Sequence, residues 1–188
     1  GRAFTTWKFT PVSRRVKPLY KLAHMLRENV EKVAHVLVTE MGKSLPDARA
    51  EMKRTIENCE VACSMPVLQQ GDKLTNVSNE IDGEVLNLPV GVFGMIAPFN
   101  FPVMVPFWFF PYAVATGNTF VLKPSEQAPM TMQLVTQYID KSGFPGGVFS
   151  LINGDGGTAK ELVSHKDVDG ISIVGSSNTC RTVSMECA

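Results

Sequence analysis

A long stretch without a charged side chain places the strongest limit on what this chain can fold into. It runs from Val85 to Leu122 and includes the segment PFNFPVMVPFWFFPYAVATGNTF. A membrane-spanning helix needs about 20 consecutive apolar residues in one continuous helix. Four prolines interrupt this segment, namely Pro98, Pro102, Pro106 and Pro111. Because each proline removes a backbone donor and disrupts a helix, the stretch predicts buried strands and a buried helix of a globular core rather than a membrane span.

The charge balance argues against a nucleic-acid partner. The 188 residues contain 18 Lys and Arg and 18 Asp and Glu, so the formal net charge is zero, whereas nucleic-acid binding usually brings an excess of positive charge. A hydrophobic content of 44% with 19% charged residues is typical of a soluble globular protein. The opening residues lack a secretion signal and the cysteines are unevenly placed, which favours the cytoplasm or the mitochondrial matrix over secretion.

The first part of the chain is predicted to be helical. Apolar side chains recur at three- and four-residue steps from Leu19 to Met41, Ser13 can cap such a helix, and Gly42 can end it. We therefore expect one helix over residues 13–41.

A second helix is expected from about Pro46 to Leu68. Cys59 and Cys63 lie one turn apart on its apolar stripe, but no further ligand follows them at the spacing of a zinc site. We interpret both thiols as core residues and predict no metal site.

The rest of the chain changes character twice. Residues 71–89 have the Gly, Asn and Asp punctuation of an extended ribbon, which could serve as an oligomerisation contact. From residue 90 onward, strand-like runs at 92–97, 119–122, 148–152 and 170–174 alternate with helical stretches at 102–116, 129–141 and 157–164. This alternation predicts an α/β fold with a doubly wound, mainly parallel sheet over residues 90–188, preceded by the helical part at 1–70.

Asn100 is the one polar residue in PFNFP that asks for an explanation. It precedes Pro102 at an expected helix start, so it could cap that helix. It also lies just beyond the carboxyl end of a predicted parallel strand, where α/β sheets bind ligands.

Four segments taken in order, PVGVFGMIAPFNFP, GNTFVLKPSEQAP, GFPGGVFSLINGDGGTA and DVDGISIVGSS, resemble the aldehyde dehydrogenase superfamily. The resemblance covers nearly the whole chain, because LAHMLRE and ARAEMKRTIENCEVA also look like the opening helices of that family. PFNFP and VPFWFFPYAVATGN look most like its CoA-acylating methylmalonate-semialdehyde dehydrogenase branch. The resemblance implies a homo-oligomeric parent enzyme that uses NAD to oxidise a small aldehyde, methylmalonate or malonate semialdehyde, to an acyl-CoA, with CoA as co-substrate.

The resemblance also implies roles for individual residues. Asn100 matches the asparagine whose amide binds the oxygen of the thiohemiacetal intermediate, a suitable donor where negative charge develops. Lys123 and Glu126 match the pair that holds the adenosine ribose, and Glu126 would repel the 2′-phosphate of NADP. The cofactor contacts implied by the family are Ala97, Pro98, Phe99, Lys123, Ser125, Glu126, Gly156, Gly175 and Ser176.

The family places its nucleophilic cysteine well downstream of the segment matching Ser176, and this chain ends twelve residues after it. Cys180 stands where the family usually has glycine, so we do not expect it or Cys187 to be the nucleophile. The isolated chain is therefore expected to be inactive, and the residues that choose the aldehyde are expected elsewhere. Two alternatives stay open: a non-catalytic fragment that binds dinucleotide or associates with subunits, and another semialdehyde dehydrogenase.

Overall fold

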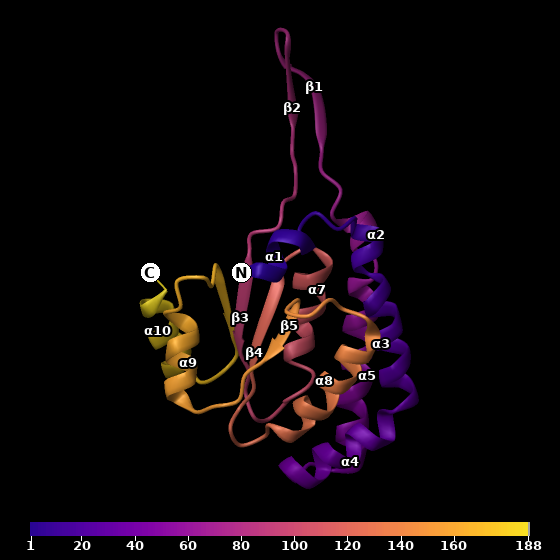
Figure 1. Ribbon diagram of the computed structural model, residues 1–188, viewed down its shortest axis with the longest axis vertical. Coiled ribbons are helices and arrows are strands. Elements are labelled where there is room, and N and C mark those ends of the chain that lie inside the picture. The colour runs from indigo at the N-terminus through magenta and orange to yellow at the C-terminus, as the bar shows by residue number, and fades with distance from the viewer. Residues whose placement is uncertain (188) are drawn as a thin grey trace.

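The computed structural model of the chain describes residues 1–187 (Figure 1). A four-stranded sheet stands in the middle, with helices on both sides and a long two-stranded hairpin projecting from one end. The helices before the sheet are α1 (Arg2–Trp7), α2 (Val12–Arg15), α3 (Lys17–Glu28), α4 (Val30–Met41), α5 (Leu45–Ala62) and α6 (Met65–Leu68).

The helix predicted over residues 13–41 is wrong as a single element, because the structure divides it into α2, α3 and α4. Ser13 lies inside α2 and caps nothing, and the N-cap position is Pro11. At Asn29 the backbone leaves helical geometry, with φ −115° and ψ 18°, while the Asn29 side-chain amide donates to the Met25 carbonyl oxygen at 2.8 Å. This local bond competes with the helical pattern, as is common for asparagine. Gly42 ends α4, as predicted, and it does so in the left-handed conformation.

The second predicted helix is also shorter than expected. Its main part, α5, is capped by Ser44, whose hydroxyl accepts a 3.3 Å hydrogen bond from the Asp47 backbone N–H, and it ends at Ala62. Residues Met65–Leu68 form the separate short helix α6. Cys59 and Cys63 are both buried, so the prediction that they belong to the core is confirmed.

The prediction of a doubly wound parallel sheet is confirmed. The strands are β3 (Val92–Ile96), β4 (Thr119–Lys123), β5 (Phe149–Leu151) and β6 (Gly170–Ile173), in the order β5-β4-β3-β6, and all three pairs are parallel. The connecting helices are α7 (Phe110–Ala115), α8 (Met130–Ser142) and α9 (Gly156–Val163), and α10 (Ser177–Glu186) follows β6. Helices α9 and α10 cover one side of the sheet, whereas α7 and α8, backed by α3 and α5, cover the other (Figure 1).

The helix predicted over residues 102–116 is shorter than expected. Residues 101–105 form turns, Pro106–Trp108 form a 3-10 turn (η1), and only Phe110–Ala115 form α-helix. Pro106 and Pro111 lack the backbone donor that a continuous helix starting at Pro102 would need at these two positions. The charge-free stretch therefore breaks into short pieces.

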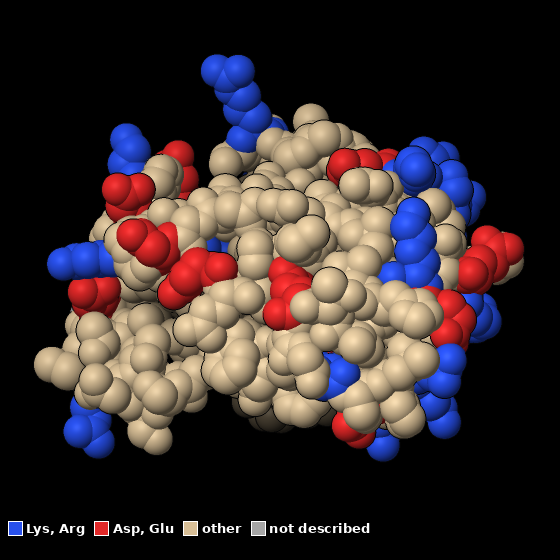
Figure 2. Space-filling model, turned by 90° about the horizontal axis from the view of Figure 1, so that it is seen from below, with Lys and Arg blue, Asp and Glu red and all other residues tan. Residues whose placement is uncertain are grey.

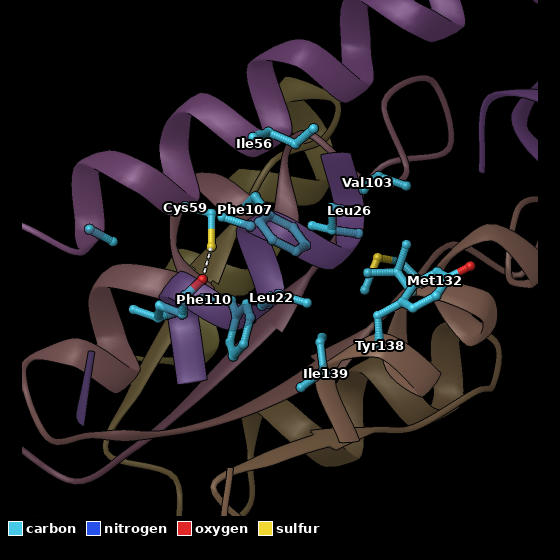
Figure 3. Close-up of a cluster of buried hydrophobic side chains, with 14 of the residues drawn as sticks. Leu22, Leu26, Ile56, Cys59, Val103, Phe107, Phe110, Met132, Tyr138 and Ile139 are labelled. Carbon is cyan, nitrogen blue, oxygen red and sulfur yellow. Dashed lines mark hydrogen bonds between the residues drawn. The ribbon is translucent and has the colours of Figure 1, made fainter. Parts of the chain in front are cut away.

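These pieces supply much of the main core, which lies between the sheet and the helical layer (Figure 3). Phe107 and Phe110 are fully buried beside Leu22 and Leu26 of α3. The Phe110 and Phe149 rings lie 4.8 Å apart between centroids in an edge-on arrangement, which suits aromatic quadrupoles. Within residues 1–187, no helix combines the length and the apolar character that a membrane crossing requires.

The predicted ribbon is an antiparallel hairpin of β1 (Lys73–Ser78) and β2 (Ile81–Glu84). It extends away from the body (Figure 1), and most of its side chains are exposed. At its root, the Asn118 side-chain oxygen accepts hydrogen bonds from the Val90 and Gly91 backbone N–H groups at 2.7 and 3.0 Å. This clamp fixes where the hairpin returns to the sheet. A role of the hairpin in oligomerisation stays a prediction.

Candidate cofactor and active site

Three loops meet at the carboxyl end of the sheet, at its lower edge in Figure 1. The Ala97 N–H donates to the Lys123 carbonyl oxygen at 3.0 Å, and the Val174 N–H donates to the Ile96 carbonyl oxygen at 3.3 Å. The loops after β3, β4 and β6 are therefore side by side. Because the chain steps from β3 to β4 and β5 in one direction and then places β6 on the other side of β3, this point is the switch point at which such sheets bind ligands.

The loop after β4 carries the predicted ribose-binding residues. Lys123 is only 3% exposed, and its ammonium donates a 2.8 Å hydrogen bond to a Glu126 carboxylate oxygen. This bond is the main reason why the pKa of Glu126 is lowered, while the nearby charge of Asp155 acts in the opposite direction. The Ser125 hydroxyl accepts a 3.2 Å hydrogen bond from the Gln127 backbone N–H, so Ser125 and Glu126 belong to one turn that follows Lys123, the last residue of β4.

The chemistry of this turn fits a ribose. A lysine ammonium has three donors, and Glu126 is the only hydrogen-bond partner of the Lys123 ammonium within residues 1–187. Burying N–H donors that have no acceptor costs free energy, and a further acceptor such as a ribose hydroxyl would remove this cost. The exposed Glu126 carboxylate can accept from a second hydroxyl.

A hollow of about 420 Å³ lies between α9 and α10, beside the end of β3. Its walls are formed by Ile96, Gly156, Ala159, Lys160, Val163, Asn178, Thr179, Thr182, Val183 and Glu186. A side-chain carbon at Gly156 would meet no other atom within 4 Å, so the surface there is open. The predicted contact residue Gly156 therefore faces free space large enough for a planar heterocycle.

Gly175 and Ser176 precede α10 at the same edge of the sheet. The Ser176 hydroxyl caps the helix by accepting from the Thr179 backbone N–H at 3.2 Å. A side-chain carbon at Gly175 would come no closer than 3.8 Å to Thr179, so sterics alone do not require glycine here. The N–H groups of Ser177 and Asn178, at the start of α10, remain available to an anion, as at other helix starts.

Asn100 lies on the loop after β3, and its exposed side chain forms no hydrogen bond within residues 1–187. The alternative that Asn100 caps a helix is wrong, because its side chain accepts no backbone hydrogen bond within residues 1–187 and the N-cap of the next helical element, η1, is Val105. Ala97 is buried under the same loop, Pro98 is half-buried, and Phe99 is 51% exposed. The amide is thus presented to the surroundings rather than used by the fold.

A second hollow, of about 520 Å³, opens beside Asn100 and Phe101. Lys43, Glu51, Arg54 and Met104 also line it, and none of these four residues was predicted from the sequence. Their signal is weak, because the first three come from a segment distant in sequence. Glu51 alone could have been noticed, since it stands between Ala48 and Thr55 on the buried face of its helix.

Asn100 and Gly156 line different hollows, and neither hollow is lined by Lys123 or Glu126. What joins the predicted residues is the common edge of the sheet, not one continuous cavity. Seen from that edge, the molecule shows a largely uncharged middle, with a few acidic groups and with most Lys and Arg side chains at its margins (Figure 2).

The cysteines of the helical layer are not poised for nucleophilic chemistry. Burial raises the pKa of the Cys59 thiol well above its usual range and that of Cys63 to about 11, so both stay protonated at neutral pH. Cys180 is half-buried in α10 and Cys187 is exposed at its end. No cluster of His, Cys, Asp or Glu in the described part of the chain could hold a metal ion.

Comparison with known proteins gives a consistent result. The sequence model described as the aldehyde dehydrogenase family matches residues 1–188. Malonate-semialdehyde dehydrogenase 2 of Shouchella clausii is 42% identical over 182 residues, which cover 97% of this chain and 37% of the relative.

Solved structures agree with this match. The crystal structure of methylmalonate-semialdehyde dehydrogenase from Oceanimonas doudoroffii superimposes with a TM-score of 0.96 at 37% identity, over 99% of this chain and 38% of that one. A Sinorhizobium meliloti structure provisionally assigned to the same activity and complexed with NAD gives 0.95 at 34% identity, over 99% and 38% of the two chains. The chain thus spans little more than a third of the length of the proteins it matches.

Proposed function

The chain belongs to the aldehyde dehydrogenase family, and we propose that it supplies the NAD-binding part of an enzyme that oxidises malonate or methylmalonate semialdehyde. The observation that carries this proposal is the meeting of the Asn100 loop and the Lys123–Glu126 turn at the switch point of the sheet. The relatives named for these semialdehydes support the choice of substrate.

NAD would be held by residues from three loops and one helix. The Lys123 ammonium would donate to ribose hydroxyls, and the Glu126 carboxylate would accept from them. The α10 start at Gly175 and Ser176 would face the pyrophosphate, and the hollow at Gly156 would receive the adenine. Ala97, Pro98 and Phe99 would lie on the nicotinamide side, and Ser125 would shape the ribose turn. When bound, the nicotinamide supplies the acceptor for hydride.

Asn100 would act on the substrate. Its unpaired side-chain amide is a neutral donor on a loop at the sheet edge, and such a donor stabilises the negative charge that develops on an aldehyde oxygen under attack. The attacking thiolate and the release of the acyl group to CoA would come from parts of the enzyme other than the residues described above.

Arg54 gives this chain a candidate for recognising the substrate. Its guanidinium belongs to the same hollow as Asn100, and it pairs with Glu57 at 3.3 Å with 72% of its side chain exposed. An exposed pair of this kind contributes little, so Arg54 can exchange Glu57 for the carboxylate of a semialdehyde. Substrate choice would then depend partly on this chain, contrary to the expectation from sequence.

The direct test is calorimetry of the 188-residue chain with NAD. We expect binding, and we expect Lys123→Met to weaken it by at least about 10-fold, or about 1.4 kcal/mol. Lys73→Met, on the exposed hairpin, is the matched control and should leave the affinity unchanged. Equal affinities for both variants and the original chain would contradict the assignment of Lys123.

Activity requires a separate measurement. We expect no steady NADH production from aldehyde by this chain alone, whereas Asn100→Ala in the full-length enzyme should lower kcat by about 100-fold or more. Steady turnover by the isolated chain, or an Asn100→Ala enzyme with unchanged kcat, would refute the proposed division of labour.

A further inference from the structure

We propose that Glu51 and Lys43 are positioning residues that hold the Asn100 loop from behind. This inference rests on the proposed role of Asn100, which it deepens by naming what fixes the loop. The two residues belong to the helical layer, about fifty positions before Asn100 in the sequence. They form an ion pair in which the Glu51 side chain is completely buried and the Lys43 side chain is 10% exposed.

Both carboxylate oxygens of Glu51 accept hydrogen bonds from Lys43 or from the loop that follows Asn100. One oxygen accepts hydrogen bonds from the Val103 and Met104 backbone N–H groups, each at 3.1 Å. The other oxygen accepts from the Lys43 ammonium. Val103 and Met104 lie in turns, so no carbonyl group of a preceding helical turn accepts hydrogen bonds from their N–H groups. The Glu51 carboxylate supplies the acceptor instead.

Lys43 contacts the backbone of Asn100 directly. Its ammonium donates a 3.0 Å hydrogen bond to the Asn100 carbonyl oxygen and lies 4.6 Å from the centre of the Phe101 ring. These contacts are an anchor on the backbone of Asn100 and a cation–π contact with its neighbour. Lys43 thus holds the backbone of Asn100 in place, while the Asn100 side-chain amide remains free to bind a substrate.

The cost of this arrangement points to a positioning role. Burying an ion pair carries a desolvation penalty that a pair of apolar side chains of similar volume would avoid. Here the buried charges contact the loop through three hydrogen bonds to its backbone. Pro98 and Pro102 cannot donate backbone hydrogen bonds of their own, so the loop depends on partners from outside it.

The decisive experiment compares paired variants in the full-length enzyme. Lys43→Met with Glu51→Leu removes both charges together and so leaves no unpaired buried ion. We expect kcat to fall by about 10- to 100-fold, as a misplaced catalytic group predicts, with the KM for NAD within twofold of the original. Lys43→Met with Glu51→Gln keeps an acceptor for Val103 and Met104, and it should recover a large part of the lost kcat.

The control pair joins the same two helices on their exposed side. Arg49 of α5 forms two 2.8 Å hydrogen bonds with Glu31 of α4. Arg49→Met with Glu31→Leu should leave kcat and KM unchanged. A Lys43→Met, Glu51→Leu enzyme that folds and keeps kcat within twofold overturns the proposal, as does a loss of kcat equal to that of the control pair.

A measurement on the 188-residue chain does not depend on catalysis. The amide protons of Val103 and Met104 should exchange slowly, and Lys43→Met with Glu51→Leu should speed them by at least about 10-fold while Met95 in β3 is unaffected. If this variant does not fold, the same exchange measured in Lys43→Met with Glu51→Gln decides, because there both amides should stay protected. Unprotected amides in the original chain would overturn the proposal, whereas an unchanged kcat in Asn100→Ala would instead refute the proposed function.

Discussion

The Lys123 ammonium, at the buried end of β4, donates a 2.8 Å hydrogen bond to the carboxylate of Glu126 three residues later. The Lys123 side chain is 4% exposed, while that of Glu126 is 55% exposed. The positive charge of Lys123 is therefore buried, while the negative charge of Glu126 is exposed to solvent. Because the hydrogen bond from Lys123 also lowers the pKa of Glu126, the negative charge persists below the pH at which an ordinary glutamate becomes neutral.

This exposed charge predicts a preference for NAD over NADP. Glu126→Gln should raise the affinity for NADP by about 10-fold, or about 1.4 kcal/mol, because it removes repulsion of the 2′-phosphate while an amide can still bond to ribose. Calorimetry with both nucleotides measures the change. Since the pKa of Glu126 is lowered, the preference of the original chain should hold from pH 8 down to about pH 5. A variant that rejects NADP as strongly as the original would contradict this explanation.

Asp155 should add to the same discrimination. Its charge is close enough to Glu126 to oppose the lowering of the Glu126 pKa, and its side chain caps α9 by accepting from the Gly157 N–H at 2.8 Å. Asp155→Asn keeps the cap, since asparagine is as good an N-cap, but removes the charge. We expect a smaller gain in NADP affinity than for Glu126→Gln, with thermal stability unchanged. An unchanged affinity for NADP would exclude Asp155 from this role.

The parts of the fold that follow from local sequence were predicted well. The four strands of the sheet and helices α8 and α9 were placed to within two residues, because apolar runs and turn residues mark their ends. The errors fall where a side chain or a proline overrides the periodic pattern. Asn29 ends α3, where its side-chain amide donates to the Met25 carbonyl oxygen one turn earlier, and the apolar pattern on both sides of it shows no interruption.

The candidate site was only partly predictable for a different reason. Lys123 ends β4, and Glu126 and Asn100 lie three and four residues past the ends of their strands, so the rule that ligands bind at strand ends finds them. Glu51 and Lys43 reach the site across the helical layer, through contacts more than fifty positions long. The position of Glu51 on the apolar face of its helix indicates that its carboxylate is buried, but no local pattern indicates which backbone groups it and Lys43 contact.

Gly94 in the middle of β3 should tolerate no larger side chain. A side-chain carbon there would lie 2.6 Å from Ile171 and 3.1 Å from Leu162 of α9. Gly94→Val should therefore lower the free energy of unfolding by about 1–3 kcal/mol through overpacking. Gly83→Val in the hairpin is the control, because its nearest neighbour would be Val77 at 3.7 Å. Urea denaturation measures both, and equal stability of Gly94→Val and the original chain would contradict the close packing of α9 on β3.

The thiols should divide into two classes. Cys59 and Cys63 are buried, whereas Cys180 is half-buried and Cys187 exposed, so a thiol reagent at pH 8 should label the last two quickly and all four after unfolding. Burial raises the pKa of Cys63 from 9.0 to about 11. The stability contributed by Cys63 is therefore complete below pH 9 and is lost as the pH rises toward 11.

Tyrosines and lysines also titrate in this pH range. The contribution of Cys63 is therefore isolated by comparing Cys63→Ala with the original chain in urea denaturation at pH 8 and pH 10. Cys63→Ala should show a smaller loss of stability between these two pH values than the original chain. Identical losses would mean that the Cys63 thiol titrates alike in the folded and unfolded states.

Glu40 at the end of α4 should stabilise the start of α8 and, through it, the cofactor turn. Its carboxylate accepts hydrogen bonds from the Met130 backbone N–H and from the Thr131 backbone N–H, the latter at 3.0 Å. It thus supplies the N-cap that the local sequence lacks, because the N-cap residue of α8 is Pro129, whose side chain cannot accept a hydrogen bond. Glu40→Ala should lower the free energy of unfolding by about 1–2 kcal/mol.

The same change should reach the cofactor, because only residues 127–129 separate Glu126 from α8. We expect Glu40→Ala to weaken NAD binding by about 3- to 10-fold, equivalent to about 0.7–1.4 kcal/mol, whereas Glu40→Gln should keep most of both properties since its amide oxygen still accepts. Glu28→Ala is the control, because within residues 1–187 Glu28 pairs only with the exposed His24, at 3.4 Å. A Glu40→Ala chain that loses stability but binds NAD as before would show that the turn at Lys123 and Glu126 is fixed by β4 alone.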